Sequence, residues 1–430
     1  MDGRPAPQNS VGRDGESLKV VVAQIGAREH YAVARALHRE GMLAGLVTDW
    51  YAKSHIKWLG SWLAGRLARG VQSALMSRCE GIPDRVVRSF LIRSLYWRHL
   101  VRQSATQGRL YEAYAETDSA FATAVSRLKM PPHEVFFGYS YASLEVLELE
   151  KKRGVFTVLG QTDPGPAEYR LVAEEIARHP EIAEAAHPFP SVHFDRNRRE
   201  WQLADMIVVN SEWSRDAIVS EGAAAEKIEV IPLCYEQEGK NVESLSNIPR
   251  TKSPLRILFL GQVNVRKGIH YLIEAARLLA NEPVEFLIVG QPGIRPEALA
   301  AAPAKMRWLG AVPRGQVSAA YQQSDVFILP TLSDGFAITQ LEALANRLPI
   351  ITTPNCGRVV EEGKTGFIVP PGDARALADA IMRFVDDRDL ATAMRPHCLE
   401  SATRYTLDGF GQTLIKAIEK RRDNKFVHAL

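Results

Sequence analysis

Two basic residues, Arg266 and Lys267, follow an apolar run and Gly261, and they precede a helix pattern over residues 269–280. Cations at a helix N-terminus oppose the helix dipole, at a cost of about 0.3–1 kcal/mol each when they are exposed. A bound anion would reverse the sign, because free N–H groups and both cations would face it. The spacing therefore predicts an anion site, and the alternative is two side chains that point into water.

Two acids form a second group. Asp334 precedes a helix pattern, so its ordinary role would be that of an N-cap, and Glu342 lies on the mostly apolar helix itself. A carboxylate among apolar neighbours needs a partner or a ligand. Eight residues of helix rise span about 12 Å. The two acids could thus grip opposite ends of a nucleotide sugar, while the amides of Gly335, Phe336 and Ala337 meet its diphosphate.

Other phosphate and metal motifs are missing from the sequence. Residues 363–365 spell the end of a phosphate loop, but the preceding glycine is one residue too far away and a strand pattern follows, so a turn is predicted. There is no GxGxxG fingerprint for a dinucleotide. There is also no HExxH, and the eleven histidines are scattered, so neither a metal site nor a cofactor is expected.

Composition narrows the class of protein. The 430 residues are 46% hydrophobic and 24% charged, which suits a globular protein of two or three domains. No apolar run reaches 18 residues, so a transmembrane helix is not expected. Residues 1–17 are polar and are expected to be disordered. They lack the apolar segment of a signal peptide, so a cytoplasmic protein is expected. The four cysteines lie far apart and predict no disulfide or zinc framework. A net charge of +3 excludes a global charge for nucleic-acid binding.

Strand-like runs alternate with helix patterns along the chain, which favours a doubly wound α/β sheet. The expected strands are residues 19–24, 45–48, 134–137, 155–159 and 206–209 in the first half, and 256–260, 285–289, 326–329, 349–352 and 367–369 in the second.

A polar stretch over residues 237–253 predicts a linker between two domains, 18–236 and 254–405. Two such sheets facing each other across a linker would create an interdomain cleft, a common place for a ligand. Three helix patterns close the chain. The last of them, in residues 406–430, could pack back on the N-terminal domain.

The C-terminal half resembles the glycosyltransferase family 4 group of retaining, nucleotide-sugar-dependent enzymes with the GT-B fold. The resemblance covers about residues 200–385 well, and the N-terminal half is a weaker match. It rests on ordered stretches at family-like spacing: 203–212, 259–268, 286–290, 309–313, 334–344 and 363–371. The fold implied is two Rossmann-like domains that face a cleft, with an N-terminal acceptor domain and a C-terminal donor domain.

The resemblance also implies roles for individual residues. Lys267, with Arg266 as a helper, matches the basic ligand of the leaving diphosphate. Glu342 matches the acid that holds the ribose, and Asp334 stands where the first acid of the motif contacts the donor sugar. The remaining donor-binding positions are Gly261, Gly290, Val312, Gly335, Phe336 and Ala337.

The sequence departs from the family pattern at three places. Asp334 replaces the more usual glutamate and is one methylene shorter, which could alter donor choice. Gln262 stands where a common pattern has arginine, and Arg266 or Arg358 could compensate. A histidine that many relatives carry near position 160 is absent. Candidates to replace this histidine are His30, Tyr139, Gln161 and Asp163, and Gly26 in the first turn of the N-terminal domain is a further candidate site residue. Gln161 and Asp163 could instead simply build a turn.

The chemistry implied is transfer of a sugar from a nucleotide sugar to an acceptor hydroxyl with retention and without a required metal, in polysaccharide or glycolipid assembly. Fixed cations and helix N-termini would stabilise charge on the leaving phosphate. The alternatives are a GT-B phosphorylase, a synthase of a soluble glycoside, and a non-catalytic scaffold that binds sugar or protein. The sequence does not identify the oligomeric state.

Residues 50–104 combine ten Lys or Arg with seven aromatic residues and only two acids. This composition suits an anionic membrane surface or a lipid-linked diphosphate acceptor. Nucleic acid is disfavoured, because no RNA- or DNA-binding motif accompanies the stretch. The alternative is a solvated helical insertion whose aromatic residues pack on the N-terminal domain.

Overall fold

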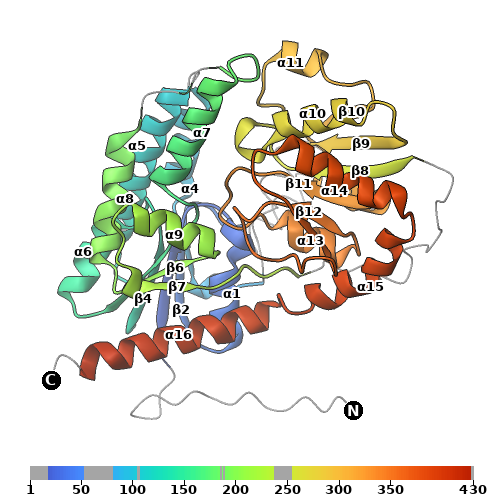
Figure 1. Cartoon of the computed structure of the whole chain (residues 1–430). Coiled ribbons are helices and arrows are strands. Elements are labelled where there is room, and N and C mark those ends of the chain that lie inside the picture. The colour runs from blue at the N-terminus through green and yellow to red at the C-terminus, as the bar shows by residue number, and fades with distance from the viewer. Residues whose placement is uncertain are drawn as a thin grey trace, which may run out of the picture.

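The computed structural model describes residues 18–52, 81–103, 107–184, 186, 189–236 and 254–427. Within these residues, two parallel β-sheets form, and helices pack on their faces (Figure 1). The expected disordered N-terminus, the linker and residues 53–80 of the basic stretch lie outside the described residues.

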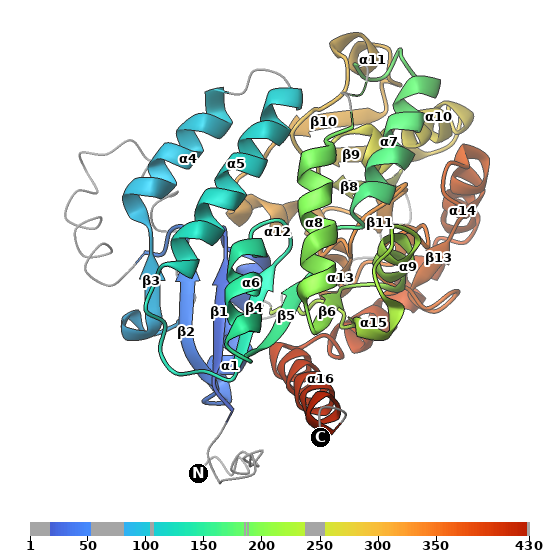
Figure 2. The ribbon, with the colours of Figure 1, turned by 90° about the vertical axis from the view of Figure 1, so that its left-hand side faces the viewer.

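The N-terminal sheet has seven strands in the order β3-β2-β1-β4-β5-β6-β7, and all its pairs are parallel. Its order reverses between β1 and β4, as in a Rossmann-like domain. Figure 2 shows helices α5, α6 and α8 on the near side of this sheet and α4 above the end of β3. The strands and helices are β1 Val20–Gln24, α1 Ala32–Arg39, β2 Leu43–Thr48, β3 Val87–Ser89, α4 Leu91–Gln103, α5 Gln107–Ser126, β4 Val135–Tyr139, α6 Leu144–Lys152, β5 Phe156–Gly160, α7 Pro166–Arg178, α8 Ser191–Leu203, β6 Met206–Val209, α9 Glu212–Ser220 and β7 Ile228–Val230.

The C-terminal sheet has six strands in the order β10-β9-β8-β11-β12-β13, again all parallel. Its order reverses between β8 and β11. In open α/β sheets, ligands bind outside the carboxyl ends of the strands at this reversal. The elements are β8 Leu255–Leu260, the 3₁₀ turn η5 Val265–Lys267, α10 Ile269–Leu278, β9 Val284–Val289, α11 Pro296–Ala300, β10 Met306–Gly310, α12 Arg314–Gln322, β11 Val326–Leu329, α13 Thr339–Ala345, β12 Ile350–Thr352, β13 Gly366–Ile368, α14 Ala374–Asp386, α15 Leu390–Ala402 and α16 Leu407–Val427.

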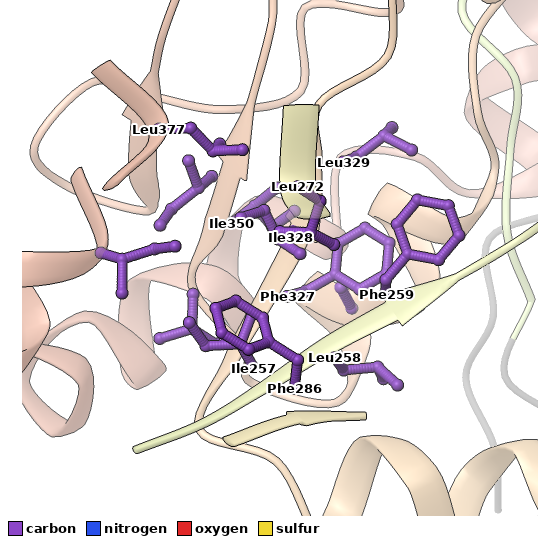
Figure 3. Packing of buried hydrophobic residues seen from close by; sticks show 14 of the residues in the cluster. Ile257, Leu258, Phe259, Leu272, Phe286, Phe327, Ile328, Leu329, Ile350 and Leu377 are labelled. Atoms are coloured by element: carbon purple, nitrogen blue, oxygen red, sulfur yellow. The ribbon is translucent and has the colours of Figure 1, made fainter. Parts of the chain in front are cut away.

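The core of the C-terminal domain lies between its central strands and the helices above them. Figure 3 shows strand residues such as Phe259, Phe286 and Phe327 packed against Leu272 of α10 and Leu377 of α14. These side chains are almost completely buried. Their burial fixes the strand ends, and therefore the loops that carry Lys267 and Asp334.

The last helix, α16, leaves the C-terminal domain and runs beneath the N-terminal one (Figure 1). It packs against α1, and its apolar face joins the core of the N-terminal domain. Arg39 of α1 donates to Asp408 of α16 at 2.7 Å. Leu407, Phe410, Leu414, Ile415 and Ile418 form that apolar face.

The aromatic residues of the basic stretch that the structure describes mostly point inward. Trp50, Tyr51 and Trp97 are buried, whereas Leu95 and Tyr96 on α4 are more than half exposed. The packing alternative therefore applies to most of the described aromatic side chains. Among the described residues, no helix combines the length and apolarity needed to cross a membrane.

Candidate active site

The two basic residues Arg266 and Lys267, the cation pair, follow β8 in a tight turn rather than in the first turn of a long helix. The Asn264 side chain accepts from the Lys267 backbone N–H at 3.1 Å and caps η5. Gly268 has a φ of 70°, and a Cβ there would lie 1.8 Å from the Pro330 carbonyl oxygen. Only glycine therefore allows η5 to approach the end of β11 this closely. This contact brings Arg266 and Lys267 to the point where the strand order reverses.

Asp334 lies in the loop after β11 and faces the cation pair. Its carboxylate forms a salt bridge with the Lys267 ammonium and lies 3.6 Å from the Arg266 guanidinium. Its Oδ1 accepts from the backbone N–H groups of Phe336 and Ala337 at 3.3 and 3.2 Å. The N-cap role expected for Asp334 is wrong, because α13 begins only at Thr339 and the acid instead closes a loop turn.

The surroundings of Lys267 weaken its hold on a proton. Its side chain is only 10% exposed. Burial, together with the neighbouring Arg266 guanidinium, lowers the pKa of the Lys267 ammonium to about 7. A strongly anionic ligand beside this buried amine would stabilise its protonated form.

The glycines at the ends of β8 and β9 touch each other. A Cβ on Gly290 would lie 1.7 Å from the Gly261 carbonyl oxygen, so the two loops meet only because this residue has no side chain. Val312 lies half-buried in the loop before α12. Gln262 is exposed and accepts from Asn264 at 3.3 Å, and Arg358 is also exposed.

Glu342 on α13 has a partner that the sequence interpretation missed. The hydroxyl of Tyr321, on α12, donates to Glu342 Oε2 at 2.9 Å and lies 3.2 Å from the Thr339 carbonyl oxygen. Burial and the adjacent Glu342 carboxylate raise the pKa of Tyr321 well above its usual value, so it remains a donor. This contact orients the half-buried acid.

Side chains of the N-terminal domain hold the Asp334 loop from the other side. The hydroxyls of Ser211 and Ser214 donate to the Gly335 carbonyl oxygen at 2.6 and 3.3 Å. Trp213 Nε1 donates to Ser333 Oγ at 2.8 Å. A Cβ on Gly335 would lie 2.7 Å from the Thr162 carbonyl oxygen, so the two domains are in direct contact here.

Glu168 of α7 completes this contact. Its Oε2 accepts from Ser333 Oγ at 2.7 Å and lies 3.7 Å from the Arg266 guanidinium. Burial raises the pKa of Glu168 above its ordinary value. Local sequence patterns gave no reason to single out Glu168, because it sits in an ordinary helical turn 165 residues before its partner Ser333.

A cavity of about 840 Å³ opens beside this contact, between the two domains. The C-terminal domain contributes Gln262, Asn264, Arg266 and residues 293–297 to its walls. The N-terminal domain contributes mainly α7 and a group of aromatic side chains. These include Tyr111, Tyr141, Tyr169, His193 and Phe194.

The five N-terminal candidates lie in different surroundings. Only Asp163 lines the cavity, where it accepts from the Tyr141 hydroxyl at 2.8 Å. Gln161 is buried and bonds inward to Asn197 and Trp201, so it supports the fold and does not line the cavity.

Tyr139 is likewise buried, and its hydroxyl donates to Glu29 at 3.1 Å. The Gly26 N–H donates to Asp49 at 2.8 Å. His30 follows Glu29 in a 3₁₀ turn where both residues have a φ of 52°. Such backbone strain is frequent at functional loops.

His193 is a cavity residue that the sequence interpretation did not name. Its ring stacks on Tyr141 with centroids 4.0 Å apart. Burial lowers the pKa of His193 to about 4, so the ring is neutral at physiological pH. Its position 32 residues after Gln161 gave no local signal, because the fold brings α8 alongside the carboxyl end of β5.

The fold brings together one group of side chains that could hold a metal ion, which the sequence spacing did not predict. Glu175, His179 and His270 come together between α7 and α10, with one ligand atom of each within 4.8 Å of the others. His270 is separated from Glu175 by 95 residues, so no spacing motif could reveal the group.

Comparisons with known proteins agree with this architecture. Residues 254–387 match the family model described as glycosyl transferases group 1. The D-inositol 3-phosphate glycosyltransferase of Corynebacterium urealyticum is 28% identical over 242 residues, which cover 50% of this chain and 56% of that protein. The amylovoran biosynthesis glycosyltransferase AmsK of Erwinia amylovora is 28% identical over 193 residues, 41% of this chain and 46% of the relative.

The matches thus span about half the length of these curated relatives. Among solved structures, Anabaena Alr3699/HepE in complex with UDP-glucose aligns with a TM-score of 0.56 and 15% identity. That alignment covers 94% of this chain and 100% of HepE. The chain therefore has the GT-B fold, and the domain that carries Lys267, Asp334 and Glu342 matches the group 1 glycosyl transferases.

Proposed function

We propose that this protein is a glycosyltransferase that moves a sugar from a nucleoside diphosphate sugar to an acceptor hydroxyl in polysaccharide or glycolipid assembly. The names of the two relatives support sugar transfer, and the UDP-glucose bound to HepE supports a nucleotide-sugar donor. Retention of configuration belongs to the proposal through the resemblance of residues 200–385 to family 4.

One observation carries the proposal: an ammonium, a guanidinium and two backbone N–H groups surround the Asp334 carboxylate at the reversal point of the C-terminal sheet. Four donors around one carboxylate make a site suited to an anion. The diphosphate of a donor would compete for Lys267 and Arg266. Asp334, released from Lys267, would then be able to accept hydrogen bonds from the sugar hydroxyls.

The same groups would supply most of the rate enhancement. As the bond between the sugar and the diphosphate breaks, negative charge grows on the leaving phosphate, and the positive charge of Lys267 and Arg266 stabilises it. Such fixed electrostatics is usually the largest contribution to catalysis. The leaving phosphate is the proposed base for the acceptor hydroxyl, so this mechanism uses no protein nucleophile and no required metal.

The interdomain cavity is the proposed path for the acceptor. Its volume of about 840 Å³ suits a sugar-sized group, and its tyrosines offer both flat faces and hydroxyls. Asp163 and the neutral His193 line this cavity and are the proposed substitutes for the missing family histidine. The contact between the two domains at the Asp334 loop would exclude water from the bound donor and limit its hydrolysis.

A panel of nucleoside diphosphate sugars tests the proposal with the full-length chain. Donor hydrolysis and transfer to glycan or lipid-linked acceptors would be followed by release of the nucleoside diphosphate. We expect turnover of at least one donor, and a loss of at least about 100-fold in Lys267→Ala, on the scale of removing one charge-stabilising donor. Glu342→Ala should mainly weaken donor binding.

Two exposed residues provide matched controls. Lys416→Ala on α16 and Glu274→Ala on α10 remove the same charges from solvated positions and should leave turnover unchanged. Turnover in Lys267→Ala and Glu342→Ala equal to that of the unaltered chain would contradict the site. Binding without turnover for every donor would instead favour the non-catalytic scaffold, and turnover that depends on inorganic phosphate would favour a phosphorylase.

A further inference from the structure

The contact between α7 and α10 contains a group of side chains that the proposed reaction does not use. Glu175 and His179 lie one turn apart on α7 and at its C-terminal end, in the N-terminal domain. His270 lies in the first turn of α10, in the C-terminal domain. His270 Nε2 is 2.9 Å and His179 Nε2 is 3.5 Å from the same atom, Glu175 Oε1.

The 3.5 Å between His179 Nε2 and Glu175 Oε1 matches the ligand spacing around a small cation, whereas the 2.9 Å between His270 Nε2 and Glu175 Oε1 is a hydrogen-bond length that would have to increase. In a four-coordinate Zn²⁺ site with bonds of about 2.0–2.2 Å, ligand atoms are about 3.3–3.6 Å apart. The three ligand atoms of Glu175, His179 and His270 all lie within 4.8 Å of one another, so small side-chain rotations would bring them to that spacing. Glu175 and His270 are 3% and 5% exposed, which keeps bulk water away from two of the three ligands.

The hydrogen bonding of His179 points the same way. Its Nδ1 lies 3.2 Å from Glu181 Oε1, and a proton shared there leaves the Nε2 lone pair facing the Glu175 carboxylate. In this tautomer the Nε2 lone pair is available to bind a cation beside the carboxylate. A carboxylate behind a ligating histidine is the arrangement that commonly orients such ligands in zinc sites.

The remaining groups around Glu175 are compatible with a metal. Arg178 donates to Glu175 Oε2 at 2.9 Å, the oxygen that the histidines do not share, and Tyr271 donates its hydroxyl to Oε1. Arg178 also lies 3.7 Å from Glu174 and is more than half exposed, so its charge is well solvated. His270 Nδ1 is buried without a hydrogen-bond partner in the described part of the chain, so no such partner fixes the tautomer of the ring.

We propose that Glu175, His179 and His270 bind a divalent transition-metal cation, Zn²⁺ by the chemistry of its two imidazoles and one carboxylate, and that this ion clamps α7 to α10 across the two domains. Three protein ligands leave a fourth position for water, which the partly exposed His179 side allows to enter. The ion would link the two domains and is separate from the proposed sugar transfer.

The clamp would fix one wall of the cavity. Glu168 and Ile176, which line the cavity, are on the same helix as Glu175, and Glu168 lies about 10 Å from it along the axis. Beyond the helix, Arg295 of the C-terminal domain donates its N–H to the Ile182 carbonyl oxygen at 2.8 Å and its Nε to that of Ala183 at 3.2 Å. A metal would therefore strengthen a contact that hydrogen bonds already make.

The test uses the full-length chain without a histidine tag, freed of metal with EDTA and then desalted. Zn²⁺ would be titrated by calorimetry, and bound metal counted after dialysis. We expect one Zn²⁺ per chain, an unfolding temperature that rises with Zn²⁺ by mass action, and visible absorption of a four-coordinate ion when Co²⁺ replaces Zn²⁺.

Substitutions at the ligands should abolish this binding. His179→Ala and His270→Ala should weaken Zn²⁺ affinity by more than about 100-fold, and Glu181→Gln by about tenfold, as expected for a residue that only orients a ligand. His270 is almost fully buried, so His270→Ala is the variant at risk of failing to fold. His179 is only partly buried, so His179→Ala should fold and still tests the metal site.

His397→Ala is the matched control, because His397 also lies beside a glutamate, Glu400, on an exposed helix face. It should bind Zn²⁺ like the unaltered chain. Zn²⁺ affinity that is the same in His179→Ala as in His397→Ala would overturn the proposal, and so would a failure of the unaltered chain to bind one equivalent. In either case the contact would be held by hydrogen bonds alone.

Discussion

The Lys267 ammonium and the Asp334 carboxylate form a salt bridge between the loops after β8 and β11, where the strand order of the C-terminal sheet reverses. The two residues are 67 positions apart in the chain. Without a donor, the acid neutralises the cation that the proposed mechanism assigns to the leaving diphosphate. Donor binding and the opening of this salt bridge are therefore coupled.

Asp334→Asn separates the two roles of this acid. The amide oxygen can still accept from Phe336 and Ala337, but the charge that holds Lys267 is gone. We expect tighter binding of UDP or another nucleoside diphosphate by several-fold, because Lys267 no longer has a competing partner. Transfer from the nucleotide sugar should fall at least about tenfold, since the sugar loses an anionic acceptor.

Calorimetry with the nucleoside diphosphate and a turnover assay would measure both effects. Asp379→Asn, on the exposed face of α14, is the control that should change neither. Weaker binding of the nucleoside diphosphate in Asp334→Asn would contradict competition between Asp334 and the phosphate.

The affinity for a nucleoside diphosphate should depend on pH through Lys267. Because burial and Arg266 lower its pKa to about 7, the ammonium form is lost in the free protein as pH rises above this value. Binding the anion then requires uptake of a proton. We expect the dissociation constant to increase between pH 7 and 9, by at most tenfold per pH unit.

Lys267→Arg should remove most of this dependence, since a guanidinium stays charged throughout this range. Binding titrations at half-unit steps of pH would show it. An affinity that does not change between pH 7 and 9 in the unaltered chain would mean that Lys267 keeps its proton in the free site.

Tyr321→Phe tests how Glu342 is positioned. The change removes the hydroxyl that donates to Glu342 at 2.9 Å and keeps the ring in the core. Loss of one hydrogen bond to a charged group is worth about 1.5–3 kcal/mol, so donor affinity should fall by about tenfold or more. Tyr51→Phe removes a buried hydroxyl bonded to the Ile82 carbonyl in the other domain and should leave donor affinity unchanged.

Gly268→Ala tests the close approach that places the cation pair. The new Cβ would meet the Pro330 carbonyl at 1.8 Å in a backbone with a φ of 70°. We expect destabilisation of at least about 2 kcal/mol, seen as a lower urea midpoint. Gly363→Ala has nearly the same φ, 72°, with no atom within 4 Å of its Cβ, and should cost only about 1 kcal/mol.

Membrane association of residues 50–104 remains a prediction that vesicle flotation can test. We expect binding to anionic vesicles that weakens with salt, as for basic surfaces on anionic lipid. Replacement of the exposed Leu95 and Tyr96 by serine should weaken it further, whereas Leu278→Ser, an exposed apolar residue of the other domain, should not. Absence of the unaltered chain from floated anionic vesicles would remove the membrane hypothesis.

The sequence alone determined the elements with continuous apolar runs. Ten of the thirteen strands in the described residues were predicted within a few residues. Nine of these ten are central parallel strands, which are buried on both faces and are therefore apolar throughout, and the tenth is the edge strand β13. The strands it missed are β3, β7 and β10, and all three lie at the edges of their sheets. Edge strands pack on fewer neighbours, so charged residues such as Arg88, Glu229 and Arg307 interrupt their apolar pattern.

Only the tertiary structure decided what the chemical groups touch. Local spacing identified Arg266, Lys267, Asp334 and Glu342 as unusual, since charges near helix ends or on apolar faces are visible in a short window of sequence. It could not reveal Glu168 against Ser333, or His270 against Glu175, because these contacts join residues 165 and 95 positions apart. Such contacts arise only when two sheets, each specified by its own apolar runs, pack against each other and bring the ends of their strands together.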